Sequence, residues 1–351
     1  MAKPEPSLYE AMQVQAYACA SLGSPLHGTI LTALAENLRN EGIVHELTKG
    51  LDLRPGRDAV PLRIIGAIHR EVLAGRAPQL ARHFPSVGGT LGPDLVNDYL
   101  AALETNRDAV LDGLGRTVQT NEVGRTTMLV TGLSHFARNF SLDGVHLREV
   151  GSSCGLNLMV DKFFFDNGKS TAGDPASTVR FAADAWGEPH VDISGFPHIA
   201  SRAGCDIAPL DAHDPESRLT LLSFVWPDQE QRFARLRGAL DIAATNPDYQ
   251  RPVAADAATW IDEQLDTLPD EPVVVFHSIV WQYFSQDTKD RFRTALRNHA
   301  QRRSSPTAWL RMEPAGAVPD LQITTWSKGS EVETDSVLAT SSYHGIGTRQ
   351  P

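Results

Sequence analysis

From about Val145 onward, short apolar segments alternate with helical stretches, and this alternation limits the fold more than any other feature of the chain. Strand-like segments interleaved with helices are typical of a mostly parallel sheet with helices on both faces, because parallel strands need a crossover connection. The predicted strands cover 146–150, 201–207, 251–254, 273–277 and 307–311. The helices expected between them cover 156–165, 229–244, 259–268 and 285–301.

The first part of the chain has a different pattern, in which apolar residues recur at helical spacing. Ser24 and Pro25 predict one helix start, with Ser24 as the cap and Pro25 in the first turn. Ile30, Leu34 and Leu38 then fall on one helix face. The sequence therefore predicts an all-helical region over 1–140 and an α/β domain over 141–351.

Composition excludes several functional classes. The 351-residue chain carries a net charge of −11, and an acidic surface repels nucleic acid and anionic lipid. The three cysteines form no CxxC pair, which argues against a disulfide framework and against a metal site. No segment has the pattern of a signal peptide or the apolar length of a membrane span. We therefore expect a cytoplasmic protein that acts on a small molecule.

The strongest local signal is a glycine loop that follows the first predicted strand. Gly151 allows the backbone to turn sharply after Val150, and Gly155 allows the next helix start to approach the strand closely. Such glycines can also form an ordinary turn without binding a ligand. Glu149 comes directly before the loop, where a carboxylate would repel a pyrophosphate. The pattern therefore favours a ligand that presents an amino acid cation.

The loop resembles the first motif of class I methyltransferases, commonly E-x-G-x-G-x-G. Residues 149–157 read EVGSSCGLN, which places Ser153 at the usual middle glycine. The resemblance implies a Rossmann-like, class I methyltransferase-type α/β sheet with S-adenosylmethionine as the cofactor. It also implies cofactor contacts from Glu149, Gly151, Ser153, Gly155 and Asn157.

The same resemblance assigns acidic residues to the next two strands. Asp206 would bind the ribose hydroxyls, although it follows the glycine loop by far more than the usual gap of about twenty residues. An insertion near 171–197 would explain the extra length. Asp256 and Ala257 would receive the adenine. The alternatives are a turn residue at Asp206 and a helix cap at Asp256.

Further polar residues are candidates for the substrate side. His277 and Ser278 end the apolar run of the fourth strand and resemble the fourth methyltransferase motif, although His277 could equally be a buried core histidine. Tyr343, His344 and Gly345 could also enter the site.

The polar stretch 119–125 supplies the remaining substrate candidates, Gln119, Asn121, Glu122 and Arg125. Glu122 and Arg125 could form a surface ion pair, or they could fold over the ligand with Arg125 holding a carboxylate. Either His277 or Glu122 would serve as the general base. We expect the helical region to cover the cleft, with Glu122 and Arg125 facing the same cavity as Gly151 and His277.

Over nearly its full length the chain also resembles a family of bacterial proteins known only as a domain of unknown function. The resemblance rests on seven short runs: HFPS at 83–86, QTNEVGR at 119–125, EVG at 149–151, GDP at 173–175, GCD at 204–206, VWP at 225–227 and FHS at 276–278. This resemblance implies that the chain is related to the family, but the family has no known activity that could be assigned to the chain.

Methyl transfer from S-adenosylmethionine to a small-molecule acceptor is the leading hypothesis. The alternative is a non-catalytic module that binds S-adenosylmethionine or another nucleotide as a sensor or a partner-binding domain. A nicotinamide-dependent oxidoreductase fits less well, because of the carboxylate of Glu149 before the loop.

Overall fold

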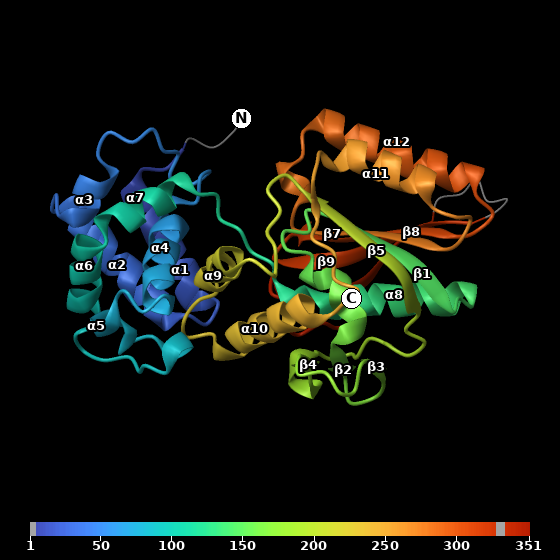
Figure 1. Cartoon of the computed structure of the whole chain (residues 1–351), viewed down its shortest axis with the longest axis horizontal. Helices are drawn as coiled ribbons and strands as arrows, with labels where there is room; N and C mark the ends of the chain where they lie inside the picture. The colour runs from blue at the N-terminus through green and yellow to red at the C-terminus, as the bar shows by residue number, and fades with distance from the viewer. Residues whose placement is uncertain (1–4, 328–333) are drawn as a thin grey trace. The chain divides into compact units, whose positions relative to one another are not determined.

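The computed structural model describes residues 5–327 and 334–351 and divides into two compact units (Figure 1). Unit 1 comprises Met1–Thr120 and Pro215–Ala234, and unit 2 comprises Asn121–Asp214 and Arg235–Pro351. Helix α10 (Glu230–Thr245) begins in the first and ends in the second. No helix within the described residues is long and apolar enough to cross a bilayer.

Unit 1 is helical. Its helices are α1 (Leu8–Ser21), α2 (Pro25–Arg39), α3 (Ile43–Thr48), α4 (Val60–Leu73), α5 (Pro78–Ala81), α6 (Leu95–Thr105), α7 (Arg107–Gly115) and α9 (Pro215–Ser223), with a 3₁₀ turn η1 at Pro85–Val87. The predicted start of α2 is confirmed, because the Ser24 hydroxyl accepts from the His27 amide and Pro25 lies in the first turn. Ile30 and Leu34 are buried on one face of that helix.

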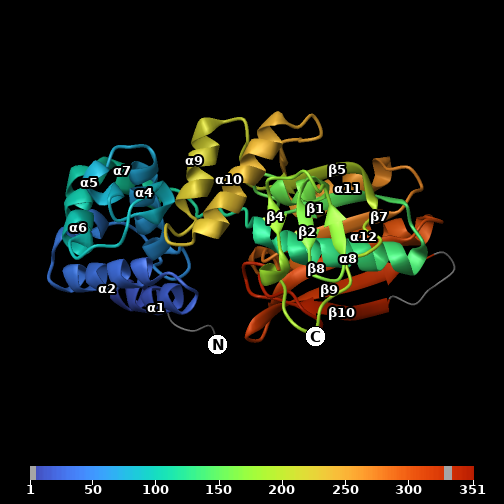
Figure 2. The same ribbon diagram turned by 90° about the horizontal axis from the view of Figure 1, so that it is seen from below.

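Unit 2 contains a seven-stranded sheet in the order β10-β9-β8-β7-β1-β5-β6. The strands are β1 (Gly144–Val150), β5 (His198–Asp206), β6 (Val253–Ala254), β7 (Val273–Ser278), β8 (Thr307–Ala315), β9 (Val318–Trp326) and β10 (Thr334–Thr340). The first five are mutually parallel, whereas β9 and β10 are antiparallel to their neighbours. The prediction of a mostly parallel α/β sheet is therefore confirmed, and Figure 2 shows the order from β10 at one edge past β8 and β1 to β5.

Helices cover both faces of this sheet. Helices α11 (Ala257–Thr267) and α12 (Gln286–Arg302) lie on one face, and α8 (Thr126–Phe140) lies on the other (Figure 1). Val150, Val273 and Val275 pack into the core formed with α11 and α12. Because strand side chains alternate, Glu149 and Ser278 project toward the α8 face.

The segment between β1 and β5 departs from the predicted helix at 156–165. A 3₁₀ helix, η3 (Leu156–Lys162), is followed by a small sheet in the order β3-β2-β4. Its strands are β2 (Phe164–Asp166), β3 (Thr171–Gly173) and β4 (Arg180–Phe181). Aromatic residues favour strands, and the rings of Phe165 and Phe181 stack with their centroids 5.0 Å apart.

Two of the buried histidines of unit 1 have strongly lowered pKa values. Burial lowers the pKa of His69 to about 4 and that of His27 to about 3. The ring of His69 contacts the Ser223 carbonyl and the Ser86 hydroxyl, at 3.0 and 2.9 Å. Within the described residues, neither ring nitrogen of His27 has a hydrogen-bond partner.

We predict that acid destabilises the fold through these histidines. Because the unfolded histidines take up protons near pH 6.5 and the folded ones do not, the free energy of unfolding falls as the pH drops from 6.5 toward 4. His27→Leu removes two unpaired polar atoms and should raise this free energy by about 1–2 kcal/mol at pH 7, and by more at pH 5. Urea unfolding at both pH values checks this, with His45→Gln as the control. Equal stability of His27→Leu and the wild type at pH 5 would contradict it.

Candidate functional site

The loop after β1 has the backbone shape that its glycines predict. Gly151, Ser153 and Gly155 all have positive φ, of 68°, 53° and 75°. A Cβ atom on Gly151 would lie 2.6 Å from Cγ2 of Val280, so the loop after β1 approaches the segment after β7 closely. Only glycine can adopt the positive φ angle and also leave space for the Val280 side chain at this position.

This loop lies at the point where the direction of the sheet connections changes. Strand β1 pairs with β5 on one side and with β7 on the other. The chain runs from β1 through β5 to β6 at the edge, and then returns across β1 to β7. In open α/β sheets, ligands bind in the crevice at the carboxyl ends of the strands at such a switch point.

The amides of the loop are engaged by side chains of unit 2. The side-chain oxygen of Asn121 accepts hydrogen bonds from the amides of Cys154 and Leu156, at 3.2 and 3.0 Å. The carboxylate of Asp206 accepts from the Ser153 amide at 2.9 Å. A pyrophosphate-binding loop presents these amides to the ligand. Here the Asn121 and Asp206 side chains already accept these three amides, and the acidic side chains beside the loop are Glu149 and Asp206.

Glu149 is the most perturbed of these carboxyl groups. It is only 2% exposed, and its Oε1 accepts a hydrogen bond from the Asn157 side chain at 3.1 Å. Its Oε2 is buried and has no hydrogen-bond partner in the described part of the chain. Burial raises the pKa of Glu149 to about 8, against the opposing effects of Asn157 and the cationic Arg125. A strongly shifted pKa beside a specific charge partner is typical of functional sites.

Arg125 connects three distant parts of unit 2. Its Nη1 donates to the carbonyl and the hydroxyl of Ser278, both at 3.3 Å, and its Nε donates to the Tyr343 carbonyl at 3.2 Å. Arg125 thereby joins the start of α8, the end of β7 and the C-terminal loop. Its charge acts on Glu149, so the structure brings together three predicted site residues.

Glu122 lies beside the same C-terminal loop. One of its carboxylate oxygens accepts from the Gly124 amide at 3.1 Å, and the other lies 3.2 Å from Nδ1 of His344. A Cβ atom on Gly124 would lie 2.0 Å from the His344 carbonyl oxygen, and one on Gly345 would lie 2.1 Å from the Gly124 carbonyl oxygen. The two backbones therefore touch, and Glu122 and Arg125 both contact the C-terminal loop.

His277 lies on the other face of the sheet. Its side chain is fully buried, its Nδ1 lies 2.7 Å from Oε1 of Glu313, and its ring stacks on Trp281 with centroids 5.1 Å apart. It also meets Phe292 of α12 edge-on. The structure thus places His277 away from the face that holds Arg125 and Glu149. Glu313 was not predicted, although a single carboxylate that ends the apolar strand β8 was a usable signal.

The acids predicted on the next strands lie at or just after the ends of β5 and β6. Asp206 ends β5, and Asp256 caps α11 by accepting from the Thr259 amide at 3.0 Å. Burial raises the pKa of the Cys205 thiol, and the charges of Asp206, Asp256 and Glu149 raise it further.

The other candidates lie at different places in the fold. Ala257 is the first residue of α11, and Gln119 belongs to unit 1. Across residues 5–327 and 334–351, no three His, Cys, Asp or Glu side chains converge to hold a metal ion.

Comparison with known proteins gives one match. The family described as "Uncharacterized protein conserved in bacteria (DUF2332)" matches residues 9–348 of this chain. No curated protein and no solved structure matches it.

The buried carboxyl of Glu149 predicts a specific dependence of stability on pH. Folded Glu149 keeps its proton up to pH 8, whereas the unfolded side chain loses it near pH 4.5. Between these values the wild type loses about 1.4 kcal/mol of stability per pH unit through this group. Glu149→Gln removes this loss, so its stability relative to the wild type should rise steadily from pH 5 to pH 8.

Urea unfolding at pH 5, 6.5 and 8 measures this difference. Glu188→Gln is the matched control, because the Glu188 side chain is 74% exposed. A Glu149→Gln effect that is the same at all three pH values would show that Glu149 is already ionised in the folded protein.

Proposed function

We propose that this chain, which belongs to the family of uncharacterised proteins conserved in bacteria (DUF2332), binds S-adenosylmethionine in unit 2 and transfers its methyl group to a small molecule. One observation carries the proposal. A buried carboxyl, Glu149, lies within the electrostatic reach of the Arg125 guanidinium at the switch point of a parallel sheet.

A carboxyl and a guanidinium at one ligand site suit an α-amino acid group. Arg125 would bind the carboxylate, for which its planar fork is well shaped. Glu149 would bind the ammonium group and lose its proton as it does so. A pyrophosphate fits less well, because Asn121 already occupies two loop amides and the Asp206 carboxylate occupies a third.

The remaining strand ends support the same cofactor. The parallel strands stand in the order β6-β5-β1-β7-β8, which is the 3-2-1-4-5 order of a doubly wound Rossmann fold. Asp206 and Asp256 follow the two strands next to β1, where a class I methyltransferase would hold ribose and adenine. Both carboxylates also bond backbone amides, so each would combine a structural role with ligand contact.

The cofactor supplies an activated methyl group on a sulfonium, so the protein mainly has to align the acceptor for in-line attack. In this proposal the pair of Glu122 and His344 would remove a proton from the acceptor. The Glu122 carboxylate lies 3.2 Å from Nδ1 of His344, so Glu122 would orient the imidazole of His344 as a general base. This pair replaces His277 as the proposed base, because His277 lies on the α12 face.

Non-catalytic binding is the second candidate function, and two observations favour it. Ser153 has a positive φ angle and occupies the position at which the class I motif usually has glycine. The Asn121 side chain accepts a hydrogen bond from the Cys154 amide of the loop, so that amide is already engaged. Formation of S-adenosylhomocysteine from S-adenosylmethionine with a panel of small amine and hydroxyl acceptors separates the two. Tight binding of S-adenosylmethionine, with no S-adenosylhomocysteine formed with any acceptor of the panel, would favour the non-catalytic sensor.

Proton release tests the role of Glu149 directly. At pH 7 a carboxyl with a pKa of about 8 is mostly protonated, so pairing with the ligand ammonium should release close to one proton. Calorimetry with S-adenosylhomocysteine in phosphate and in Tris buffer, whose ionisation enthalpies differ, measures this number. Glu149→Gln should bind more weakly and release no proton.

NAD provides the comparison ligand. Binding of NAD without any response to S-adenosylhomocysteine would overturn the proposed cofactor. Binding of S-adenosylhomocysteine with no proton release would leave the cofactor in place and remove Glu149 from its amino acid site.

Asp206 is expected to bind the ribose. Asp206→Asn keeps a side-chain oxygen for the Ser153 amide but removes the charge, and should weaken S-adenosylhomocysteine binding by about 1.5–3 kcal/mol. Asp166→Asn in the small sheet is the matched control, because Asp166 also accepts a backbone amide outside the site. Unchanged affinity in Asp206→Asn would assign the ribose to another group.

A further inference from the structure

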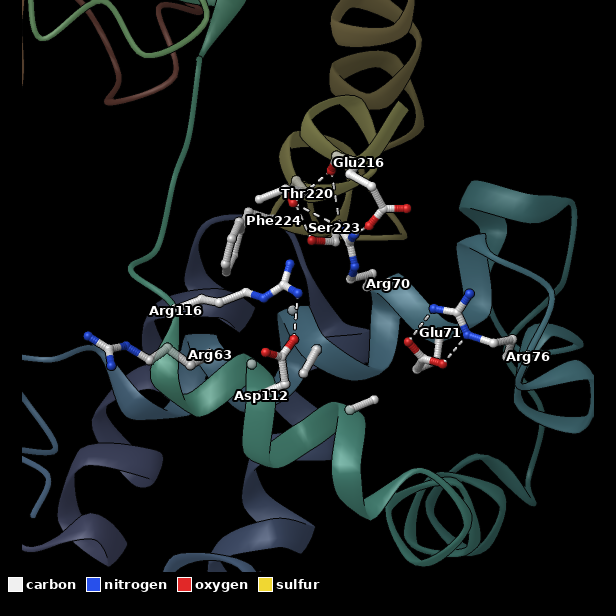
Figure 3. Close-up of a pocket in the computed structure, with 14 residues that line it drawn as sticks. Arg63, Arg70, Glu71, Arg76, Asp112, Arg116, Glu216, Thr220, Ser223 and Phe224 are labelled. Carbon is white, nitrogen blue, oxygen red and sulfur yellow. Dashed lines mark hydrogen bonds and ion pairs between the residues drawn. The ribbon is translucent and has the colours of Figure 1, made fainter. Parts of the chain in front are cut away.

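Unit 1 contains a hollow that the proposed methyl transfer does not use. It has a volume of about 250 Å³ and lies between α4, α7 and α9 (Figure 3). Its floor is made of small residues packed closely together. A Cβ atom on Gly113 would lie 2.5 Å from that of Ala67, and one on Gly66 would lie 2.6 Å from the ring of Phe224. The floor is therefore closed, and the hollow opens between charged walls.

The walls carry more positive than negative charge. Four arginines and three carboxylates line the hollow: Arg63, Arg70, Arg76, Arg116, Glu71, Asp112 and Glu216. This local excess of positive charge lies in a chain whose net charge is −11. Arg76 and Glu71 form a two-bond pair at 2.5 and 2.6 Å, so these two neutralise each other at one end of the hollow.

Arg70 and Arg116 are paired with carboxylates that are more exposed than Glu71. The Arg70 side chain is 11% exposed, but its partner Glu216 is 74% exposed, so a buried cation depends on an exposed anion. Arg116 and Asp112 are 43% and 62% exposed and four residues apart, and such pairs contribute little. In Figure 3 the side chains of Arg70 and Arg116 both extend toward α9.

Arg63 adds another guanidinium, whose charge also acts on Asp58 outside the hollow. Its Nη1 donates to the Leu114 carbonyl at 2.7 Å. Its Nε is buried and has no hydrogen-bond partner in the described part of the chain. A desolvated guanidinium is stabilised by an anion that can replace its lost hydration. The hollow therefore offers positive charge that its own carboxylates do not fully compensate.

We propose that this hollow binds a small dianion, a phosphoryl or dicarboxylate group, between Arg70 and Arg116. Guanidinium forks bind both groups through paired hydrogen bonds, and the Thr220 hydroxyl, which lies 2.8 Å from Nη1 of Arg70, adds a polar neighbour. The volume is below that of typical sites for larger ligands, which favours a small metabolite over a nucleotide.

Calorimetry on the full-length chain tests this with inorganic phosphate and with succinate, each against sodium chloride at equal ionic strength. We expect one of the two anions to bind with one-to-one stoichiometry. Arg116→Gln should weaken it about tenfold or more, because a charge-assisted pair is lost from an exposed position that the fold does not need. Binding of phosphate alone identifies a phosphoryl ligand, and binding of succinate alone identifies a dicarboxylate.

Arg107→Gln is the matched control, because Arg107 is an equally exposed arginine of unit 1 paired with Glu46 and Glu104. It should leave anion binding unchanged, and Arg116→Gln should leave the affinity for S-adenosylhomocysteine unchanged. The proposal is overturned if neither anion binds more tightly than chloride. It is also overturned if Arg116→Gln and Arg107→Gln weaken binding equally. Neither result bears on the cofactor site of unit 2.

Discussion

The two hydrogen bonds that the Asn121 side chain accepts from the loop after β1 set the geometry of the proposed site. They tie the segment before α8 to the carboxyl end of the central strand. This contact fixes where α8 begins, and hence where Arg125 reaches β7 and the C-terminal loop. It also keeps the loop closed over Glu149, whose raised pKa depends on exclusion from water.

Two buried ionisable groups at neighbouring strand ends have opposite surroundings. Glu149 faces α8 and the cationic Arg125, whereas His277 is enclosed by aromatic rings and contacts the carboxylate of Glu313. Strands β1 and β7 are adjacent, so a thin layer of backbone separates the two environments.

Local sequence patterns predicted the parallel strands and the turn after β1, but not the contacts between residues far apart in the chain. Apolar alternation located the parallel strands, and Gly151 and Gly155 predicted the turn whose positive φ angles the structure shows. The face on which His277 lies follows from strand phase relative to α12, which a short apolar run does not define. The contact between Glu122 and His344 joins residues far apart in the chain, so no local signal could predict it.

The backbone contact between Gly124 and Gly345 also has a consequence for how the protein is made. One partner is synthesised before any strand of the large sheet and the other after all of them. Gly124 is synthesised long before Gly345. Its neighbours Glu122 and Arg125 therefore cannot contact His344 and Tyr343 until those residues have been synthesised. Long sequence separations of this kind slow folding. The contacts that Glu122 and Arg125 make with the C-terminal loop can therefore form only after every strand of the large sheet has been synthesised.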